Sequence, residues 1–178
     1  CSSDLANEEK LTPYITLTTE AGAIGGVLAS GSGFGAATNA DSIIQQNQQF
    51  DFYDGGGLDM TCLGMAECDL QGNVNTSKFG GRLNGCGGFI NISQNARLVI
   101  FAGTFTNGGL KVEVTDGKVN IVQEGRNKKF LNSVEQITFS GKYAQKRKQP
   151  VYYVTERCVF KLVDKGLELV EIAPGIDI

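Results

Sequence analysis

The sequence contains no histidine and no tryptophan, and only three of its 178 residues are proline. Without histidine, a serine–histidine–aspartate triad and a histidine-ligated zinc site are both excluded. A catalyst built from these residues must therefore use carboxylates, hydroxyls, thiols, lysines or backbone amides. The sequence also lacks an apolar run of roughly 18–20 residues, the length that spans a bilayer as a helix.

The sequence also lacks a large excess of positive or negative charge. The chain has 16 basic and 19 acidic residues, a net charge of −3, and its longest basic run is Lys146-Arg147-Lys148. A surface that binds nucleic acid or a membrane electrostatically needs a larger basic patch. We therefore expect no nucleic acid and no membrane among the partners.

The five cysteines are odd in number and form no Cys-x-x-Cys motif. Scattered cysteines of this kind favour free thiols in a reducing compartment rather than a disulfide framework. The N-terminus also lacks a basic region followed by an apolar segment. We expect a cytoplasmic protein, or one from an organelle matrix. The cysteines are Cys1, Cys62, Cys68, Cys86 and Cys158.

Length and composition are those of one globular domain. A chain of 178 residues with 41% hydrophobic and 20% charged residues can bury a core. We expect a single catalytic domain over residues 1–178. The polar, acidic start at residues 1–12 and the abrupt apolar end after Pro174-Gly175 favour a segment of a longer chain.

Glycine is the one residue type in excess, with 24 of 178 residues. The glycines gather at residues 22–35, 55–57, 80–88 and 108–109, between apolar segments. Clusters of this kind predict tight turns where the backbone closely approaches something else.

The first half is predicted to mix strands with short helices. Residues 14–19 alternate apolar and polar side chains and predict a strand that ends at Glu20. Asn39 or Asp41 could cap a short helix through Ile44. Short strands are expected at 50–53, before a glycine turn, and at 58–63.

The second half is predicted to be dominated by strands. Leu98–Phe101 is an uninterrupted apolar run, typical of a strand buried on both faces. Asp116-Gly117 predicts a hairpin turn. The remaining β-type runs are 110–114, 119–122, 134–139, 151–154, 158–162 and 167–172.

The segment Gly31-Ser32-Gly33-Phe34-Gly35-Ala36 fits the Gly-x-Gly-x-x-Gly/Ala pattern of dinucleotide-binding proteins, with Asp51 and Asp54 further along. The pattern needs a buried strand before it and a long helix after it. Neither is predicted here, so a flexible active-site or anion-binding loop is favoured over a nicotinamide site.

A set of acidic residues could form a metal site built from oxygen ligands. However, no calcium-loop spacing is present, and aspartates beside glycine turns commonly act as caps or turn formers. The structural interpretation is therefore favoured. The set comprises Asp51, Asp54, Asp59, Glu67 and Asp69.

A second glycine loop, Gly85-Cys86-Gly87-Gly88, leads into an apolar element. Cys86 could be a nucleophilic thiol, although no histidine exists to activate it. Alternatively, the glycines could present amide N–H groups to an oxyanion, or the loop could be a simple turn.

Glu20 is followed directly by the first glycine-rich turn. A carboxylate becomes a nucleophile when it is desolvated and when backbone amides stabilise the oxyanion that its attack produces. From spacing alone, a solvated turn glutamate remains the alternative.

Several of these segments together resemble the family I coenzyme A transferases, in particular the catalytic half of the propionate/acetate type. The similarity extends in register over nearly the whole chain. The segments that carry it are residues 19–26, 49–59, 85–93, 153–160, 166–169 and 172–176.

The resemblance implies that Glu20 is the catalytic carboxylate and that Gly85, Gly87 and Gly88 belong to the loop that donates an amide to the oxyanion. The family's Glu-(Ser or Asn)-Gly motif is here Glu20-Ala21-Gly22, so Ala21 cannot supply a side-chain hydrogen bond. Candidates for lining the substrate pocket are Gly22, Gly25, Gly26, Gly55 and Gly56.

The resemblance further implies a ping-pong transfer of coenzyme A between a short-chain acyl-CoA and a carboxylic acid, through a glutamyl-CoA thioester. Such an enzyme needs no metal and no permanently bound cofactor, because coenzyme A is its substrate. The expected partners are acyl-CoA, a short-chain carboxylate, the missing N-terminal half and further copies of the chain in a homo-oligomer.

The expected fold is α/β, an open mixed sheet with flanking helices and β-rich additions over residues 110–139. Two other functions remain open: acyl-CoA hydrolysis, in which water intercepts the acyl or glutamyl intermediate, and a non-catalytic CoA-binding or assembly module.

Overall fold

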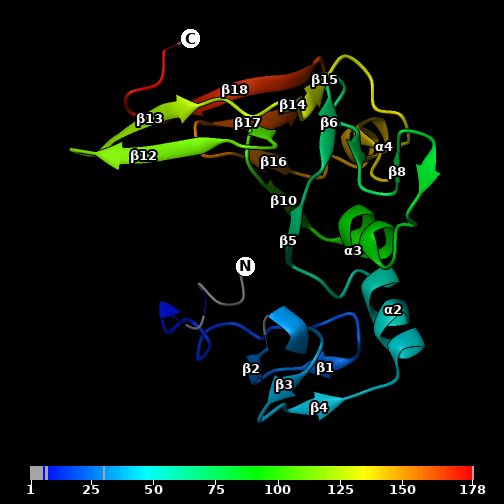
Figure 1. Cartoon of the computed structure of the whole chain (residues 1–178). Coiled ribbons are helices and arrows are strands. Elements are labelled where there is room, and N and C mark those ends of the chain that lie inside the picture. The colour runs from blue at the N-terminus through cyan, green and yellow to red at the C-terminus, as the bar shows by residue number, and fades with distance from the viewer. Residues whose placement is uncertain (1–5, 7, 30, 178) are drawn as a thin grey trace. The chain divides into compact units, whose positions relative to one another are not determined.

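A computed structural model describes residue 6 and residues 8–29 and 31–177 of the chain (Figure 1). The chain forms two compact units, Cys1–Gly57 and Leu58–Ile178, and each is described by itself. The assignment of residues 1–178 to one catalytic domain stays a prediction. No described helix is long and apolar enough to cross a membrane.

In its described residues, the first unit contains two small antiparallel strand pairs and the helix α2 (Figure 1). Strand β1 pairs with β4, and β2 pairs with β3 through a loop that contains the 3-10 helix η1. The elements are β1 (Ala23–Ile24), β2 (Val27–Leu28), η1 (Gly31–Gly33), β3 (Ala37–Thr38), β4 (Ser42–Ile43) and α2 (Gln46–Asp54).

Helix α2 corrects the prediction of a strand at residues 50–53. It begins at a capping box, in which the side chains of Gln45 and Gln48 exchange bonds with the backbone. Gln49 and Tyr53, four residues apart, form its buried face. The helix is capped at its C-terminus by Gly55, so the glycine turn predicted after this element is present. The capping glutamines outweigh the β preference of the aromatic residues.

Two further predictions for this unit are wrong. Residues 14–19 contribute only an isolated bridge between Thr18 and Ile24, and the side chains of Tyr14 and Ile15 are 84% and 41% exposed. An alternating segment forms a strand only where a neighbouring strand pairs with it and its apolar side chains are covered by other parts of the protein. The expected helix through Ile44 is instead strand β4, which pairs with β1.

The second unit contains a five-stranded mixed sheet in the order β18-β17-β16-β10-β5. The strands β5, β10 and β16 are parallel, whereas β17 and β18 are antiparallel to their neighbours. Their bounds are β5 (Met60–Gly64), β10 (Leu98–Ala102), β16 (Val151–Val154), β17 (Cys158–Val163) and β18 (Gly166–Ile172). This mixed sheet confirms the expected fold class.

A small three-stranded sheet, β15-β6-β7, and several strand pairs accompany the five-stranded sheet, and the long hairpin of β12 and β13 extends from it (Figure 1). The predicted turn at Asp116-Gly117 is confirmed, since both residues have positive φ angles, 51° and 72°. The bounds are β6 (Glu67–Asp69), β7 (Val74–Asn75), β8 (Lys78–Phe79), β9 (Arg82–Leu83), β11 (Thr106–Asn107), β12 (Lys111–Thr115), β13 (Lys118–Gln123), β14 (Asn127–Lys128) and β15 (Phe130–Leu131).

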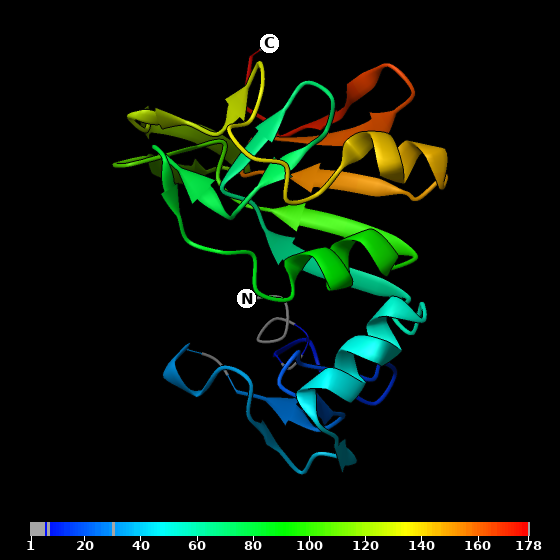
Figure 2. The ribbon, with the colours of Figure 1, turned by 90° about the vertical axis from the view of Figure 1, so that its right-hand side faces the viewer.

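Helices α3 (Phe89–Asn95) and α4 (Gly141–Lys146) lie on the same side of the sheet (Figures 1 and 2). The side-chain oxygen of Ser140 accepts a hydrogen bond from Tyr143 N and caps α4. This helix is absent from the sequence prediction. The strand predicted at 134–139 is wrong, because only Phe139 forms a bridge, with Val74.

Phe101 lies at the centre of the hydrophobic core of the second unit and is fully buried. Its ring is 5.7 Å from that of Phe89 on α3, 5.0 Å from that of Phe139 and 5.4 Å from that of Tyr153 on β16. The strand prediction for 98–101 is confirmed by β10, whose Val99 and Phe101 are completely buried. The core therefore joins the central strands to α3.

Phe101→Ala should lower the free energy of unfolding by about 3–5 kcal/mol, because it leaves a cavity among three aromatic rings. Phe101→Leu, which fills much of the same volume, should cost less than half as much. Urea denaturation followed by circular dichroism measures both values. Equal losses for the two variants would contradict this description of the core.

Candidate functional site

Glu20 is the first residue of a three-residue hairpin loop. Thr19 N donates to Ala23 O at 3.0 Å, and Gly25 N donates to Leu17 O at 2.8 Å, so the chain folds back on itself around residues 20–22. A three-residue hairpin loop commonly has a positive φ at its last position, and Gly22 has φ of 114°. Glu20 is half-buried, while Ala21 is exposed.

Gly22 is required by close packing as well as by its backbone angle. A β-carbon at this position would lie 2.0 Å from the carbonyl oxygen of Ile44. The two residues are joined by a hydrogen bond of 3.0 Å from Ile44 N to Gly22 O. The glycine therefore holds the Glu20 loop against the segment between β4 and α2.

Gly25 and Gly26 have a similar structural role. Both have φ of 73°, and β-carbons there would collide with the side chain of Asp41 and with Thr38 O, respectively. Gly55 and Gly56 follow α2, and only Gly56 has open space where a β-carbon would be. Among these five candidates for the substrate pocket, a β-carbon would collide with protein atoms at Gly22, Gly25 and Gly26, whereas at Gly55 the nearest atom is Asp51 O at 3.2 Å.

The loop of residues 31–36 lies beside Glu20 rather than at a dinucleotide site. The hydroxyl of Thr19 donates to Gly35 O at 3.2 Å, and a β-carbon on Gly35 would be 3.3 Å from that of Ala21. The loop follows a two-residue strand and is followed by β3, not by a long helix. The structure therefore agrees with a loop at residues 31–36 and not with a dinucleotide-binding site.

Helix α2 is fixed to the same hairpin. The hydroxyl groups of Tyr53 and Thr18 are 2.8 Å apart, and Tyr53 is 2% exposed. The Glu20 loop is thus supported from three directions within the first unit: by α2, by Ile44 and by the loop around Gly35.

The second glycine loop, residues 85–88, precedes α3 in the second unit. Gly85 N donates to Ser77 O at 3.2 Å, so this amide is already engaged. Within the described part of the chain, the amides of Gly87 and Gly88 donate to no protein acceptor. Gly85 and Gly87 have positive φ and open space around the position of a β-carbon. The available donors are therefore Gly87 and Gly88.

The cysteines remain thiols where they are described. Cys62, Cys68, Cys86 and Cys158 are free, and Cys1 lies outside the described residues. Burial raises the pKa values of Cys68 and Cys158, which keeps both protonated. Cys86 is half-buried beside the glycines of its loop.

The acidic residues between positions 51 and 69 have different structural roles. Asp69 is 3% exposed, and its carboxylate accepts backbone N–H bonds from Gln71, Asn73 and Val134. Asp59 pairs with Arg97 at 3.0 Å on the surface. Among the described residues, no group of three or more potential ligands could hold a metal ion.

Several charged side chains lie at the carboxyl ends of β5, β10 and β16, where ligands bind in open α/β sheets. The sequence patterns gave no functional role to these residues. Lys129 Nζ donates to Met65 O at 3.2 Å, and burial lowers the pKa of this lysine. Glu156 accepts from Phe105 N at 2.7 Å and from Arg157 Nε at 2.7 Å. Only the parallel pairing of the strands brings these residues together.

Arg157 connects this edge of the sheet to the segment after β13. Its guanidinium donates to both oxygens of Glu124, at 2.9 and 3.1 Å, and lies over the Phe105 ring at 4.7 Å. Glu124 also accepts a hydrogen bond from the Thr106 hydroxyl. The bonds from Arg157 and Thr106 lower the pKa of Glu124 to about 2.

The chain has close relatives among known proteins. It is 52% identical over 98% of its length to the acetate CoA-transferase YdiF of Escherichia coli K12, and 50% identical over 99% of its length to the caffeate CoA-transferase of Acetobacterium woodii. It spans about a third of the length of these relatives, 33% and 34%, respectively. No protein-family model matches the chain.

Solved structures agree with these relatives. The apoenzyme of the acyl-CoA transferase YdiF from Escherichia coli O157:H7 matches 98% of this chain and 33% of its own, with a TM-score of 0.91 and 50% identity. The same transferase as a thioester complex with CoA gives a TM-score of 0.90. The decarboxylase AibA/AibB matches 93% of this chain and 67% of its own at 17% identity and a TM-score of 0.63, and shows the fold alone.

The homologues are therefore CoA-transferases, as the sequence resemblance implied, and the propionate type is not specified among them. The α/β fold with a mixed sheet is shared with YdiF.

Gly22→Ala should destabilise the protein by about 3 kcal/mol or more, because the new methyl group meets a backbone oxygen and the backbone is left-handed. Gly31→Ala is the matched control: its φ is 58°, but nothing lies within 4 Å of the added carbon. We expect it to cost about 1 kcal/mol. Chemical denaturation compares the variants, and similar costs for both would refute the close contact with Ile44.

The depressed pKa of Glu124 predicts a pH dependence of stability. Its contribution is present above its ordinary value of 4.5 and is lost as the pH falls toward about 2. Because the side chain is 52% exposed, the effect should be at most about 1 kcal/mol. The difference in unfolding free energy between wild type and Glu124→Gln should shrink from pH 5 to pH 3. Glu168→Gln, at an exposed position on β18, is the control.

Proposed function

We propose that this chain is the catalytic segment of a family I CoA-transferase of the propionate/acetate type, and that Glu20 is its nucleophile. The observation that carries the proposal is the similarity of nearly the whole chain, at 50% identity, to an acyl-CoA transferase solved as a thioester complex with CoA. A thioester between an enzyme and coenzyme A requires a carboxylate on the enzyme, and Glu20 is the carboxylate that the family motif selects.

The surroundings of Glu20 suit this role. The side chain is half-buried in a hairpin loop that Gly22 and Tyr53 fix in position. A fixed loop limits the freedom of the carboxylate before it reacts, which reduces the entropic cost of attack. Partial desolvation makes the carboxylate a better nucleophile than it would be in water.

The reaction begins when the Glu20 carboxylate attacks the thioester carbonyl of an acyl-CoA, giving an acyl–glutamyl anhydride and CoA thiolate. The thiolate then attacks the glutamyl carbonyl, which releases the first carboxylic acid and leaves a Glu20–CoA thioester. An incoming carboxylate reverses both steps and departs as its own CoA ester. No metal and no permanently bound cofactor takes part, because coenzyme A is itself a substrate.

Each tetrahedral intermediate in this sequence carries an oxyanion that needs a hydrogen-bond donor. Gly87 and Gly88 are the better candidates among the loop glycines, because Gly85 N already donates to Ser77 O. Loss of one such donor typically costs on the order of 100–1,000-fold in rate.

The chain spans only about a third of the length of its relatives, which supports a further region in the whole enzyme. The relatives are about three times as long, so we propose that the rest of the enzyme, including an N-terminal half, completes the site for acyl-CoA and a short-chain carboxylate. The proposed protein is a cytoplasmic homo-oligomer, and the segment alone is inactive.

Glu20→Gln in the full-length enzyme should lower the transfer rate by roughly 1,000-fold or more, since the amide cannot form the thioester. Glu9→Gln, which makes the same change at an exposed position of the same unit, should leave the rate unchanged. Hydroxylamine trapping after incubation with acyl-CoA should modify Glu20. Modification of a different carboxylate, or unchanged transfer by Glu20→Gln, would exclude the assignment.

The same assay separates the two other functions. Release of CoA from acyl-CoA without an acceptor acid would indicate a hydrolase. If the full-length protein binds acyl-CoA but neither transfers nor hydrolyses it, a binding or assembly module is the correct description.

A further inference from the structure

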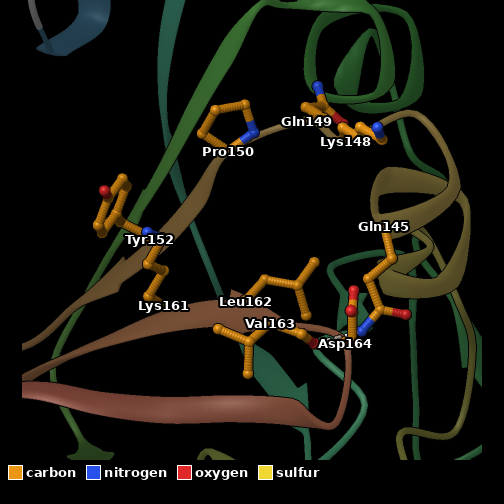
Figure 3. Close-up of a pocket in the computed structure, with 9 residues that line it drawn as sticks. All are labelled: Gln145, Lys148, Gln149, Pro150, Tyr152, Lys161, Leu162, Val163 and Asp164. Atoms are coloured by element: carbon orange, nitrogen blue, oxygen red, sulfur yellow. Dashed lines mark hydrogen bonds between the residues drawn. The ribbon is translucent and has the colours of Figure 1, made fainter.

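An open cavity of about 380 Å³ lies at the amino end of β16, between α4 and β17 (Figure 3). In Figure 3, Pro150 lies above the opening, Leu162 lies below it and Gln145 lies at its side, whereas the side chain of Val163 points away from Pro150. The volume falls in the range of small-molecule sites.

A second cavity of about 230 Å³ adjoins the first one. The two share Lys148 and Gln149, and the second is lined in addition by Arg97 and Arg147. It lies at the C-terminal end of α3, because Gln149 Nε2 donates to Ala96 O at 2.6 Å. The glycine loop of residues 85–88 precedes the other end of this helix, which is seven residues, or roughly 10 Å, long.

Cations dominate the charge around the two cavities. Lys148, Lys161, Arg97 and Arg147 line them, against the single carboxylate of Asp164. Arg97 is paired with Asp59, but within the described residues neither lysine forms a salt bridge. In a chain of net charge −3, this local excess of positive charge favours an anionic ligand.

Lys148 occupies a position that normally belongs to glycine. It follows α4 with φ of 55°, and the bonds Lys148 N to Gln145 O and Gln149 N to Ala144 O form a Schellman motif. A non-glycine residue in the left-handed region is strained, and such strain is found preferentially at functional sites. The backbone at Lys148 therefore marks this lysine as a candidate ligand-binding residue.

We propose that the two adjoining cavities form a binding site for a phosphorylated nucleoside, separate from the glycine loop of residues 85–88. Lys148 and Lys161 bind the phosphate groups. The apolar side chains of Pro150 and Leu162 pack against the base, and the second cavity gives the ligand room beyond a single phosphate. The ligand is a free nucleotide or the nucleotide end of coenzyme A. The site itself does not depend on Glu20 or on the transfer reaction.

Photolabelling of the full-length protein with 8-azido-ADP tests the location. Peptide mapping should find the label within residues 141–165. Protection by ADP but not by CoA identifies a free nucleotide, whereas protection by CoA at lower concentrations identifies the coenzyme. Label found only outside residues 141–165, or no saturable labelling, would overturn the site whether or not the protein transfers CoA.

Substitutions test the two lysines. Lys161→Ala and Lys148→Gly should each weaken saturable labelling of this region about tenfold, the loss expected for a charged hydrogen bond. Lys142→Ala, an exposed lysine of α4 that lines neither cavity, is the control and should label like wild type. Labelling should also weaken as the salt concentration rises.

Lys148→Gly has a second readout. Glycine suits the left-handed backbone, so the Tm of this variant should be unchanged or higher than that of wild type. Weaker labelling with an intact Tm supports the site, because loss of structure cannot explain it. Labelling as strong as that of wild type would refute the role of Lys148.

Discussion

The first unit depends on the close approach of two backbone segments at Gly22 and Ile44. A β-carbon on Gly22 would lie 2.0 Å from Ile44 O, and the left-handed backbone at Gly22 closes the three-residue loop that begins with Glu20. Because of this contact, the segment leading into α2 lies against the hairpin, and Tyr53 of that helix reaches Thr18. The position of the candidate nucleophile is therefore set by a glycine two residues away.

The two glycine loops serve different physical purposes. In the loop after Glu20, the glycines allow protein atoms to approach closely, as Gly25 and Gly26 do beside Asp41 and Thr38. In the loop before α3, Gly85 and Gly87 have positive φ angles in open space, and among the described residues the amides of Gly87 and Gly88 have no protein acceptor. The first arrangement fixes a side chain, and the second can present backbone donors to a ligand. Acyl transfer through a carboxylate needs both.

The second unit carries ionisable groups at both ends of its parallel strands. At the carboxyl ends, Arg157 donates hydrogen bonds to both Glu156 and Glu124. At the amino end of β16, Lys148 and Lys161 line a cavity without carboxylate partners among the described residues. The saturated network holds a hairpin to the sheet, whereas the lysines without salt bridges leave positive charge available to a ligand.

The sequence by itself determined the fold class, the buried strand β10, the hairpin at Asp116-Gly117 and the motif that selects Glu20, because these follow from local patterns or from family resemblance. It predicted the first unit poorly: residues 14–19 alternate like a strand but lack a covering sheet, and capping glutamines make a helix of the aromatic run at 50–53. Only the tertiary structure decided which glycines face protein atoms, which amides are already engaged and which lysines line a cavity. Those properties depend on contacts between residues distant in sequence, which local patterns do not record.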